Sequence, residues 1–177
     1  MASFTDRIMR AVKLDANLYE EVEADTGAMG QAIGIVVISS IAAGVGSIGE
    51  VGGAGIFVGT LAAIAAWFIW AYLTYIIGTK LLPEPQTKAD IGEMLRTIGF
   101  SSSPGLIRVL GILPGIGGVI FFIASVWMLV AMVIAVRQAL DYTSTWRAVG
   151  VCLIGWVIQA IILGGLFYAM GGPPKIE

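Results

Sequence analysis

The sequence contains no histidine and only one cysteine, Cys152. Without imidazole it cannot build a His-ligated haem or chlorophyll site, most zinc sites, or a catalytic triad with a histidine base. One cysteine excludes an intramolecular disulfide, and the apolar run around Cys152 indicates a thiol that packs as a small hydrophobic side chain. We therefore expect no enzyme activity, with no catalytic, cofactor-binding or metal-binding residues.

Charged residues are also scarce, at 12% of the chain, and ten Lys and Arg face twelve Asp and Glu. This balance provides no basic surface for nucleic acid, so we expect no nucleic-acid partner. Hydrophobic residues make up 58% of the chain, above the roughly 45–50% of soluble domains. Together with a mean hydropathy of +0.91, this composition predicts an integral membrane protein.

Long stretches without charged side chains predict an all-α protein, a five-transmembrane-helix bundle. Four stretches exceed the roughly 20 apolar residues that a span needs, and a fifth, weaker one contains Arg108. We expect a cytoplasmic amphipathic segment at residues 1–27, a membrane domain at 28–172 and a short outer tail at 173–177. The predicted spans cover residues 28–49, 54–80, 98–113, 115–137 and 148–170.

The distribution of Lys and Arg predicts the orientation of these spans. With five spans and a cytoplasmic N-terminus, the inner segments hold eight of the ten basic residues, and the outer segments hold only Lys175. With four spans, seven basic residues would lie on the inner side and two, Arg137 and Arg147, on the outer side. The first 27 residues carry six acidic residues and no short apolar core, so they do not resemble a signal peptide. We expect the N-terminus inside and the C-terminus outside.

Two segments predict cytoplasmic interfacial helices. A Ser-x-x-Asp capping box at Ser3 and Asp6 precedes apolar residues spaced four apart. Thr87 and Asp90 repeat the box and predict a helix over residues 87–98, which would lead into the third span. Two placements are open for both helices: lying in the membrane surface, or packing on the bundle. The apolar residues of these helices are Phe4, Ile8, Val12, Ile91, Met94, Leu95 and Ile98.

Glycine is abundant, with 24 residues, and much of it falls in small-xxx-small spacing. In lipid this spacing lets helix backbones approach closely, either within one chain or across a homodimer. The run from Gly44 to Gly59 predicts an outer loop between two glycine-rich helix ends. The spaced pairs are Gly30 and Gly34, Ala42 and Gly46, Gly55 and Gly59, and Ala131 and Ala135.

Arg108 is the most costly residue in its predicted position, because an arginine inside a span is unfavourable by roughly 2.5–3.5 kcal/mol. It lies five residues before the outer end of the third span, and Glu50 is the acid available on that side. Three roles are open: a structural pair with Glu50, snorkelling of the guanidinium to the outer headgroups, or a charged gate on a transport path.

Two further features mark the ends of predicted spans. Pro104, which follows three serines, cannot donate to the carbonyl of Phe100, so it predicts either a kink or a re-entrant break. At the inner end of the fourth span, Arg137 and Asp141 stand four residues apart, as an i, i+4 ion pair requires.

Four motifs follow one another along the chain: Leu14–Val22, Met94–Phe100 followed by Pro104, the Trp127 span ending at Leu140, and Ser144–Ala148. In this order they resemble the Yip family, membrane proteins named for their interaction with Rab-type GTPases in eukaryotes and also found in bacteria. The resemblance implies a five-helix bundle with a cytoplasmic N-terminus and an adaptor role. The short Asp-Leu-Tyr-Gly-Pro element of the eukaryotic proteins is reduced here to Leu18-Tyr19, so we do not expect Rab-type GTPase binding. Short termini favour the bacterial branch and the inner membrane.

These observations predict a non-enzymatic membrane scaffold or accessory subunit. It would bind other integral membrane proteins, or a larger membrane complex, through its bundle faces and cytoplasmic helices, with lipids and a second copy as further partners. The alternative is a small oligomeric transporter or channel with the Arg108 and Pro104 region on its path.

Overall fold

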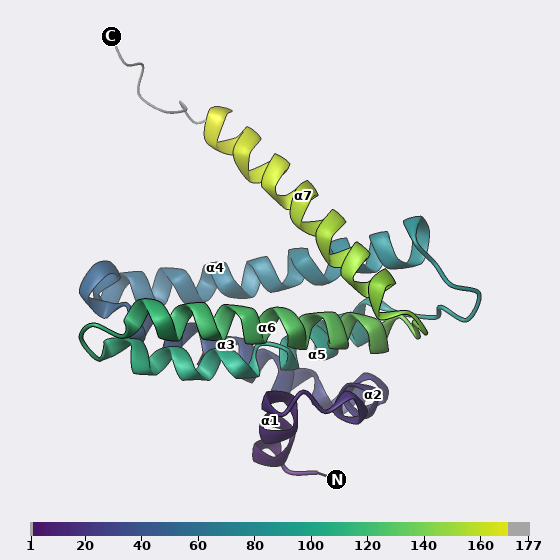
Figure 1. The fold of residues 1–177 in the computed structure, drawn as a ribbon, viewed down its shortest axis with the longest axis horizontal. Coiled ribbons are helices and arrows are strands. Elements are labelled where there is room, and N and C mark those ends of the chain that lie inside the picture. Colours follow the sequence, from purple (N-terminus) through teal and green to yellow (C-terminus); the bar gives the residue numbers. More distant parts are fainter. Residues whose placement is uncertain (1, 170–177) are drawn as a thin grey trace.

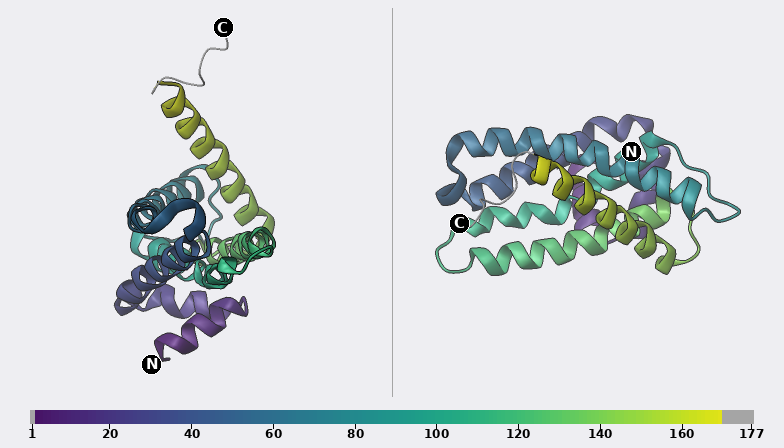
Figure 2. Two further views of the ribbon diagram at one scale, coloured as in Figure 1. Left: turned by 90° about the vertical axis from the view of Figure 1, so that its left-hand side faces the viewer. Right: turned by 90° about the horizontal axis from the view of Figure 1, so that it is seen from above.

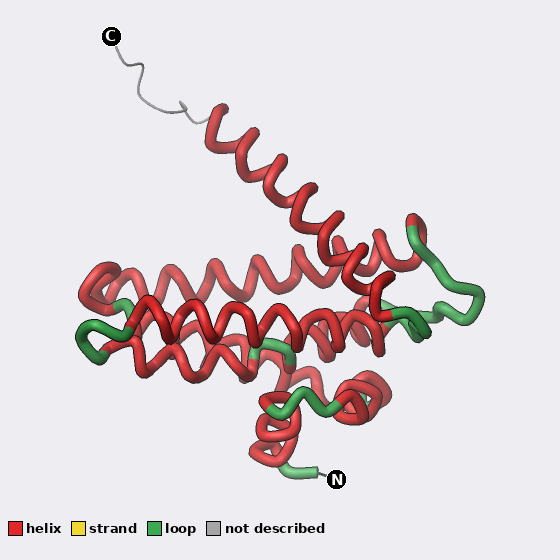
Figure 3. Tube along the Cα trace, in the orientation of Figure 1, coloured by secondary structure: helices red, strands yellow, loops and turns green. Residues whose placement is uncertain are grey.

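The structure, a computed structural model, describes the backbone of residues 2–169 and the side chains of residues 2–162. All regular structure in this part of the chain is helical (Figure 3). The predicted outer tail at 173–177 and Lys175 lie outside the described residues. The elements are α1 (Phe4–Val12), α2 (Ala16–Ala24), η1 (Thr26–Ala28), α3 (Met29–Gly46), α4 (Ile48–Ile76), η2 (Ile77–Leu81), α5 (Ile91–Phe100), η3 (Ser103–Ile112), α6 (Gly117–Ala139) and α7 (Thr145–Ala169).

Four helical segments among the described residues are long and apolar enough to cross a membrane: Thr26–Gly46, Ile48–Leu81, Gly117–Ala139 and Thr145–Ile162. The predicted fifth span at 98–113 is not one continuous helix. It consists of the end of α5 and the 3₁₀ helix η3, with a break at Ser101 and Ser102. The chain is therefore an all-α protein with four candidate membrane helices, and a fifth crossing stays a prediction.

The helix connections gather at two ends of the bundle (Figure 1). The connections at residues 82–90 and 140–144 lie at one end, which we call the platform end because α1 and α2 pack toward it. The turns at Ser47 and at residues 113–116 lie at the other, which we call the turn end. Since α5 and η3 lead from the platform end to the turn end, together they run the length of the bundle beside α3 and α6.

The glycine-rich run that predicted an outer loop is helical instead. Residues 44–59 belong to α3 and α4, with Ser47 alone between them. Gly52 is the one described residue of α4 with non-helical torsions, at φ 63° and ψ 178°. A backbone in lipid must satisfy its own hydrogen bonds, so a glycine run stays helical despite its low propensity. The prediction of a loop from Gly44 to Gly59 was therefore wrong.

The core is concentrated at the platform end. Seven consecutive residues of α5, Met94–Phe100, are buried under α2, α3, α4 and α6. This helix is thus packed inside the bundle and not laid on its surface. Its capping box is formed by Asp90 and Glu93, three residues after the predicted start at Thr87, because the Asp90 carboxylate accepts the Glu93 N–H at 2.9 Å.

The spaced small residues serve packing within this chain at two of the four predicted pairs. Ala42, Ala131 and Ala135 are buried. At Gly46 a Cβ would meet the carbonyl oxygen of Arg108, so only glycine lets α3 and η3 approach this closely. A Cβ added at Gly30 or Gly59 would have no described atom within 4 Å. These two glycines therefore do not allow a close helix contact among the described residues.

The last helix, α7, leaves the bundle at a steep angle from the platform end (Figures 1 and 2). Its first half packs against α4 and α6, where Ala148, Val151 and Cys152 are buried. Farther along, Val157 and Ile161 are exposed. The divergence of α7 opens the space beside α6 that is described below.

Candidate functional site

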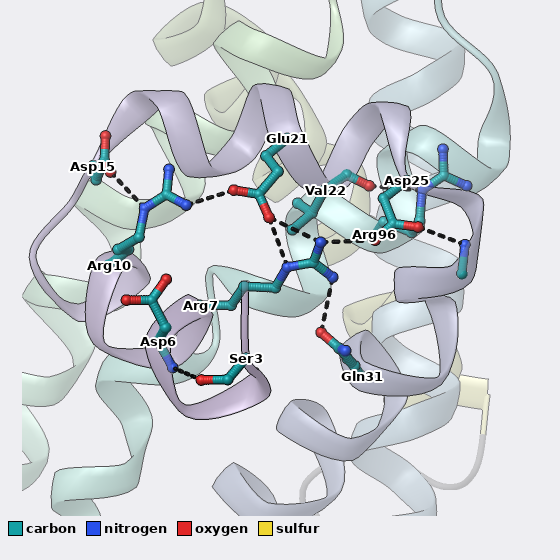
Figure 4. Close-up of polar contacts among 11 residues, drawn as sticks. Ser3, Asp6, Arg7, Arg10, Asp15, Glu21, Val22, Asp25, Gln31 and Arg96 are labelled. Atoms are coloured by element: carbon teal, nitrogen blue, oxygen red, sulfur yellow. Dashed lines mark hydrogen bonds and ion pairs between the residues drawn. The ribbon is translucent and has the colours of Figure 1, made fainter. Parts of the chain in front are cut away.

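The N-terminal helices are joined to the bundle by a network of ion pairs centred on Arg7 (Figure 4). Its guanidinium donates to the Glu21 carboxylate at 2.9 Å, to the Asp25 carboxylate at 2.7 Å and to the Gln31 amide oxygen at 3.0 Å. These partners lie on α2, at the start of η1 and on α3. One side chain on α1 therefore holds three other segments in place.

Arg10, one turn after Arg7 on α1, extends this network. It donates to Asp15 at 2.8 Å and to the second oxygen of Glu21 at 2.5 Å. Glu21 thus receives both arginines, one at each carboxylate oxygen (Figure 4). Hydrogen bonding from Arg10, with a smaller contribution from Arg7, holds the pKa of the Glu21 carboxyl below its ordinary value.

Burial distinguishes this network from ordinary surface ion pairs. Only 3% of Arg7 is exposed. Burial by itself disfavours its charge, but the hydrogen bonds that it donates to Asp25 and Glu21, together with the charges of these carboxylates, outweigh burial, and the pKa of Arg7 is raised. Removing one partner from such a site leaves an uncompensated buried charge. We therefore treat α1 and α2 as a fixed platform rather than a loose tail.

Three donors from the bundle bind backbone carbonyls around the platform. Arg96 of α5 donates to the Val22 carbonyl at 2.9 Å and to that of Glu23. The indole N–H of Trp127 on α6 donates to the Val12 carbonyl at 2.9 Å, and that of Trp67 on α4 donates to the α5 carbonyl of Leu95 at 3.1 Å. The carbonyl ends of α1 and α2, which have no partner within their own helices, are thus bound by side chains of α6 and α5.

An acidic patch lies beside this platform and comprises Glu20, Glu23, Glu93 and Asp141. Burial and the neighbouring carboxylates of Asp141, Glu93 and Glu20 raise the pKa of Glu23 to about 8, against the opposing effect of Arg96. Its Oε2 is buried and has no hydrogen-bond partner among the described residues. The Glu23 carboxyl therefore keeps its proton at neutral pH, and the negative charge of the patch is carried by its other three carboxylates.

A polar groove of about 700 Å³ adjoins the patch at the platform end. Glu20 and Asp141 contribute to its wall, as do two basic residues, Lys88 and Arg137. Gln138 donates to the Glu20 carboxylate at 2.5 Å across it. The groove has the size of a ligand site but mixed charge, which suits a peptide segment better than a small apolar molecule.

The two connections at the platform end are bonded to each other. The Glu84 carboxylate accepts the backbone N–H of Thr143 at 3.0 Å and its hydroxyl at 2.8 Å, and Arg147 lies 3.2 Å from its other oxygen. These hydrogen bonds, the one from the Thr143 backbone foremost, lower the pKa of Glu84. The Tyr142 hydroxyl lies 2.7 Å from the Leu82 carbonyl. The connections at residues 82–90 and 140–144 are thus held together by hydrogen bonds.

The structure does not bring the predicted partners Arg108 and Glu50 together. Arg108 donates to the Ser125 hydroxyl at 3.3 Å, and its guanidinium carbon lies 5.7 Å from the centre of the Phe121 ring. Glu50 instead lines a pocket with the turn at residues 111–117. The predicted topology puts the two residues on the same side of the membrane. In the structure the Arg108 guanidinium contacts α6, whereas Glu50 lies at the turn end beside residues 111–117. Of the three roles considered, the structural pair with Glu50 is therefore wrong.

Pro104 lies at the start of η3, where the chain changes from α-helix to 3₁₀ helix. The hydroxyls of Ser101 and Ser103 donate to the carbonyls of Ile98 and Phe100, at 2.7 Å each. The serines thus bond carbonyls that lose their helical partners at the break, as the pattern predicts. Pro104 is buried and forms part of the packing between η3 and α3.

Arg137 and Asp141 are near each other in sequence but form no ion pair in the part of the chain that the structure describes. The helix α6 ends at Ala139, and Asp141 adopts φ 53°, which turns its side chain away from the helical i, i+4 position. Arg137 donates to the Tyr142 carbonyl at 3.2 Å instead. The predicted pair is thus wrong because the helix stops two residues too early.

The platform residues were not predicted as a site. The signal was present, because Arg7 and Arg10 stand one turn apart on one amphipathic helix while Glu21 and Asp25 stand one turn apart just downstream. Pairing them requires knowing that α1 folds back over α2, which the Leu14 turn with φ 61° produces.

Comparison with known proteins assigns the chain to a family. The family model described as the Yip1 domain matches residues 20–167, which is well over half of the chain. No curated protein and no solved structure matches the chain. Among the described residues, no group of three or more His, Cys, Asp or Glu side chains could hold a metal ion.

Proposed function

The chain belongs to the Yip1 domain family, as the order of its motifs predicts, and from this premise we propose that it is a non-enzymatic membrane scaffold or accessory subunit. Its partner in this proposal is another integral membrane protein, recognised at the platform end. The family is not a known enzyme family. The observation that carries the proposal is the fixed position of α1 and α2, held by the buried Arg7 network.

A fixed platform favours binding because little conformational entropy is lost when a partner docks. A free N-terminal tail of this length would have to be ordered first. Here the ion pairs and the carbonyl contacts of Arg96 and Trp127 have already ordered it. The platform therefore presents a stable surface beside the membrane helices, as an adaptor needs.

The charge of the acidic patch indicates the chemistry of the partner. Integral membrane proteins carry an excess of Lys and Arg in their short cytoplasmic loops. The basic count predicts that the platform end faces the cytoplasm, so the patch would meet such loops. A basic loop seated in the adjoining groove would meet the carboxylates of Glu20 and Asp141 in its wall.

The outer face of α4 offers a second, intramembrane contact in this proposal. Phe57, Leu61 and Tyr72 are exposed along it, and no described atom lies within 4 Å of the Cβ position of Gly59. Exposed small residues let a second helix approach closely in lipid. Contact through α4 would extend the interface from the platform into the membrane.

Affinity purification from native membranes in a mild detergent, followed by mass spectrometry, tests the proposal. The variant Glu20→Gln with Asp141→Asn removes two charges of the patch and keeps the side-chain shapes. The expected result is a stoichiometric membrane-protein partner with the wild-type chain and its loss with the double variant. Glu50→Gln, which removes an exposed acid at the turn end, should retain the partner.

Recovery of the chain alone as a homo-oligomer would contradict the scaffold role and favour the alternative of a small transporter or channel. A partner that stays bound to the double variant would contradict docking at the acidic patch.

A further inference from the structure

A cavity of about 310 Å³ lies in the middle of the bundle, about halfway along α6. Residues of six elements line it, and the divergence of α7 leaves space there that side chains do not fill. The volume is at the lower end of the range of about 300–1,000 Å³ for ligand sites. Its wall includes Ser39 of α3, Trp70 of α4, Arg108 of η3, Met128 of α6 and Gln159 of α7.

Two donors at this cavity lack acceptors. The Nε of Arg108 and the Nε1 of Trp70 are both buried and have no hydrogen-bond partner among the described residues. Trp70 as a whole is 7% exposed. Buried donors without partners are rare in folded proteins, and each one needs an explanation. Two such donors on one cavity indicate a ligand group that accepts hydrogen bonds.

The chemistry of the donors indicates an anion. Neither an indole nor a guanidinium can accept a hydrogen bond, so both call for the same complement. Arg108 is charged, forms no ion pair with any carboxylate in the described part of the chain, and donates only weakly to Ser125 at 3.3 Å. A carboxylate or phosphate oxygen would satisfy both donors and neutralise the charge.

The space next to this cavity is apolar. A second pocket of about 350 Å³ shares Arg108, Met128, Met132 and Trp156 with the first. It runs along α6 beside α7, with Phe122 and Val126 as exposed walls. A hydrocarbon chain fits such a lining, and an inorganic anion does not use it. The two pockets together have the polarity of an amphiphile, with a charged head at Arg108 and a tail along α6.

We propose that this pair of pockets binds an anionic membrane amphiphile, with Arg108 and Trp70 as donors to its head and the α6 groove as the seat of its acyl chain. The head chemistry is shared by an anionic phospholipid and a free fatty acid. The inference is independent of the proposed scaffold role, since it uses no residue of the platform.

Lipid titration of the delipidated full-length chain in neutral detergent, read by native mass spectrometry, tests the site. The probes are phosphatidylglycerol, phosphatidylcholine with the same acyl chains, and oleate. We expect the wild-type chain to bind phosphatidylglycerol or oleate about tenfold or more tightly than phosphatidylcholine. Preference for phosphatidylglycerol identifies a phospholipid site, and preference for oleate identifies a fatty-acid site.

Three variants separate the cavity from general attraction of lipid to basic residues. Arg108→Gln should abolish the preference, and Trp70→Phe, which removes only the N–H, should weaken binding severalfold. Lys80→Gln, which removes an exposed positive charge near the platform end, should leave the preference intact. If Arg108→Gln does not fold, Arg108→Lys with Trp70→Phe replaces it, and the severalfold loss is still expected.

Equal binding of phosphatidylglycerol, oleate and phosphatidylcholine by the wild-type chain would overturn the proposal. So would a preference for anionic lipid that Arg108→Gln and Trp70→Phe leave unchanged, because the two orphaned donors would then bind water.

Discussion

At the scale of single residues, the buried Arg7 and the half-buried Arg108 show how the available acceptors decide the effect of an arginine. Both guanidiniums lie among membrane helices or against them, but Arg7 has two carboxylates and an amide as acceptors, whereas Arg108 has a distant hydroxyl and an aromatic ring. Arg7 therefore stabilises the fold, and Arg108 is left to interact with something beyond the chain.

Replacing Arg7 by Gln should lower the free energy of unfolding by about 2–4 kcal/mol, because Glu21 and Asp25 lose a buried partner. Denaturant unfolding in detergent, followed by circular dichroism, measures the loss. Lys13→Gln, which changes an exposed charge at the end of α1, should alter stability by less than about 0.5 kcal/mol. Equal effects of both variants would show that the network contributes no more than surface charge.

Glu23 predicts the pH dependence of stability. Its pKa is about 8 in the folded protein and near its ordinary value of 4.5 in the unfolded chain, so the folded state binds the proton more tightly. The stabilisation is complete below about pH 4.5 and is lost as the pH rises through about 8. Glu23→Gln should remove this decline, as measured by denaturant unfolding between pH 5 and 9.

The neighbouring ion pairs do not obscure this window. The carboxyls of Glu21 and Asp25 have lowered pKa values, so their contribution is lost only below the ordinary carboxyl range. A wild-type stability that stays level from pH 5 to 8, or a decline that persists in Glu23→Gln, would contradict the burial of the Glu23 carboxyl.

At the scale of elements, α4 shows how one glycine determines the path of a long helix. Its backbone is helical on both sides of Gly52, whose torsions of 63° and 178° lie in a region that only glycine adopts readily. This single change of direction redirects the chain just after the turn at Ser47. The other glycines nearby can remain in helical conformation.

Gly52→Ala should therefore destabilise the protein by about 1–3 kcal/mol, since a Cβ is strained at this torsion. Gly53→Ala is the matched control, because no described atom lies within 4 Å of its Cβ position. The control should be neutral or stabilise by up to about 1 kcal/mol through reduced freedom of the unfolded chain. Thermal unfolding in detergent compares the two, and an equal loss at both positions would contradict a strain specific to the Gly52 torsion.

At the scale of the whole molecule, the path of α5 and η3 determines the topology. These elements begin at the platform end and finish at the turn end, although neither alone is long enough to cross a membrane. If the pair crosses, the turns at Ser47 and Leu113 lie on the same side of the membrane, and the connection at Gln86 lies on the other.

Single-cysteine labelling in a Cys152→Ala background tests this arrangement. A cysteine at Ser47 or Leu113 should react with an impermeant reagent from outside intact cells, and one at Gln86 only after lysis. This result would also place the N-terminus inside, as the distribution of basic residues predicts. Labelling of Leu113 on the same side as Gln86 would show that η3 does not cross.

Local sequence patterns were enough to predict the class of the protein, its four candidate membrane helices and its family. Hydropathy is a sum over neighbouring residues, so long apolar stretches predict helices in lipid without any knowledge of contacts. The Ser3 cap is equally local and is confirmed, since its hydroxyl accepts the Asp6 N–H at 3.1 Å. The order of motifs along the chain identified the Yip1 family in the same way.

Which charged side chains form ion pairs depends on the packing of separate helices. Arg7 pairs with Glu21 and Asp25 because the turn at Leu14 folds α1 over α2, and Arg108 misses Glu50 because η3 faces α6. Arg137 and Asp141 miss each other because α6 ends between them. Ion pairs act over a few ångströms and depend on the facing of separate helices, which residue spacing along one segment does not specify.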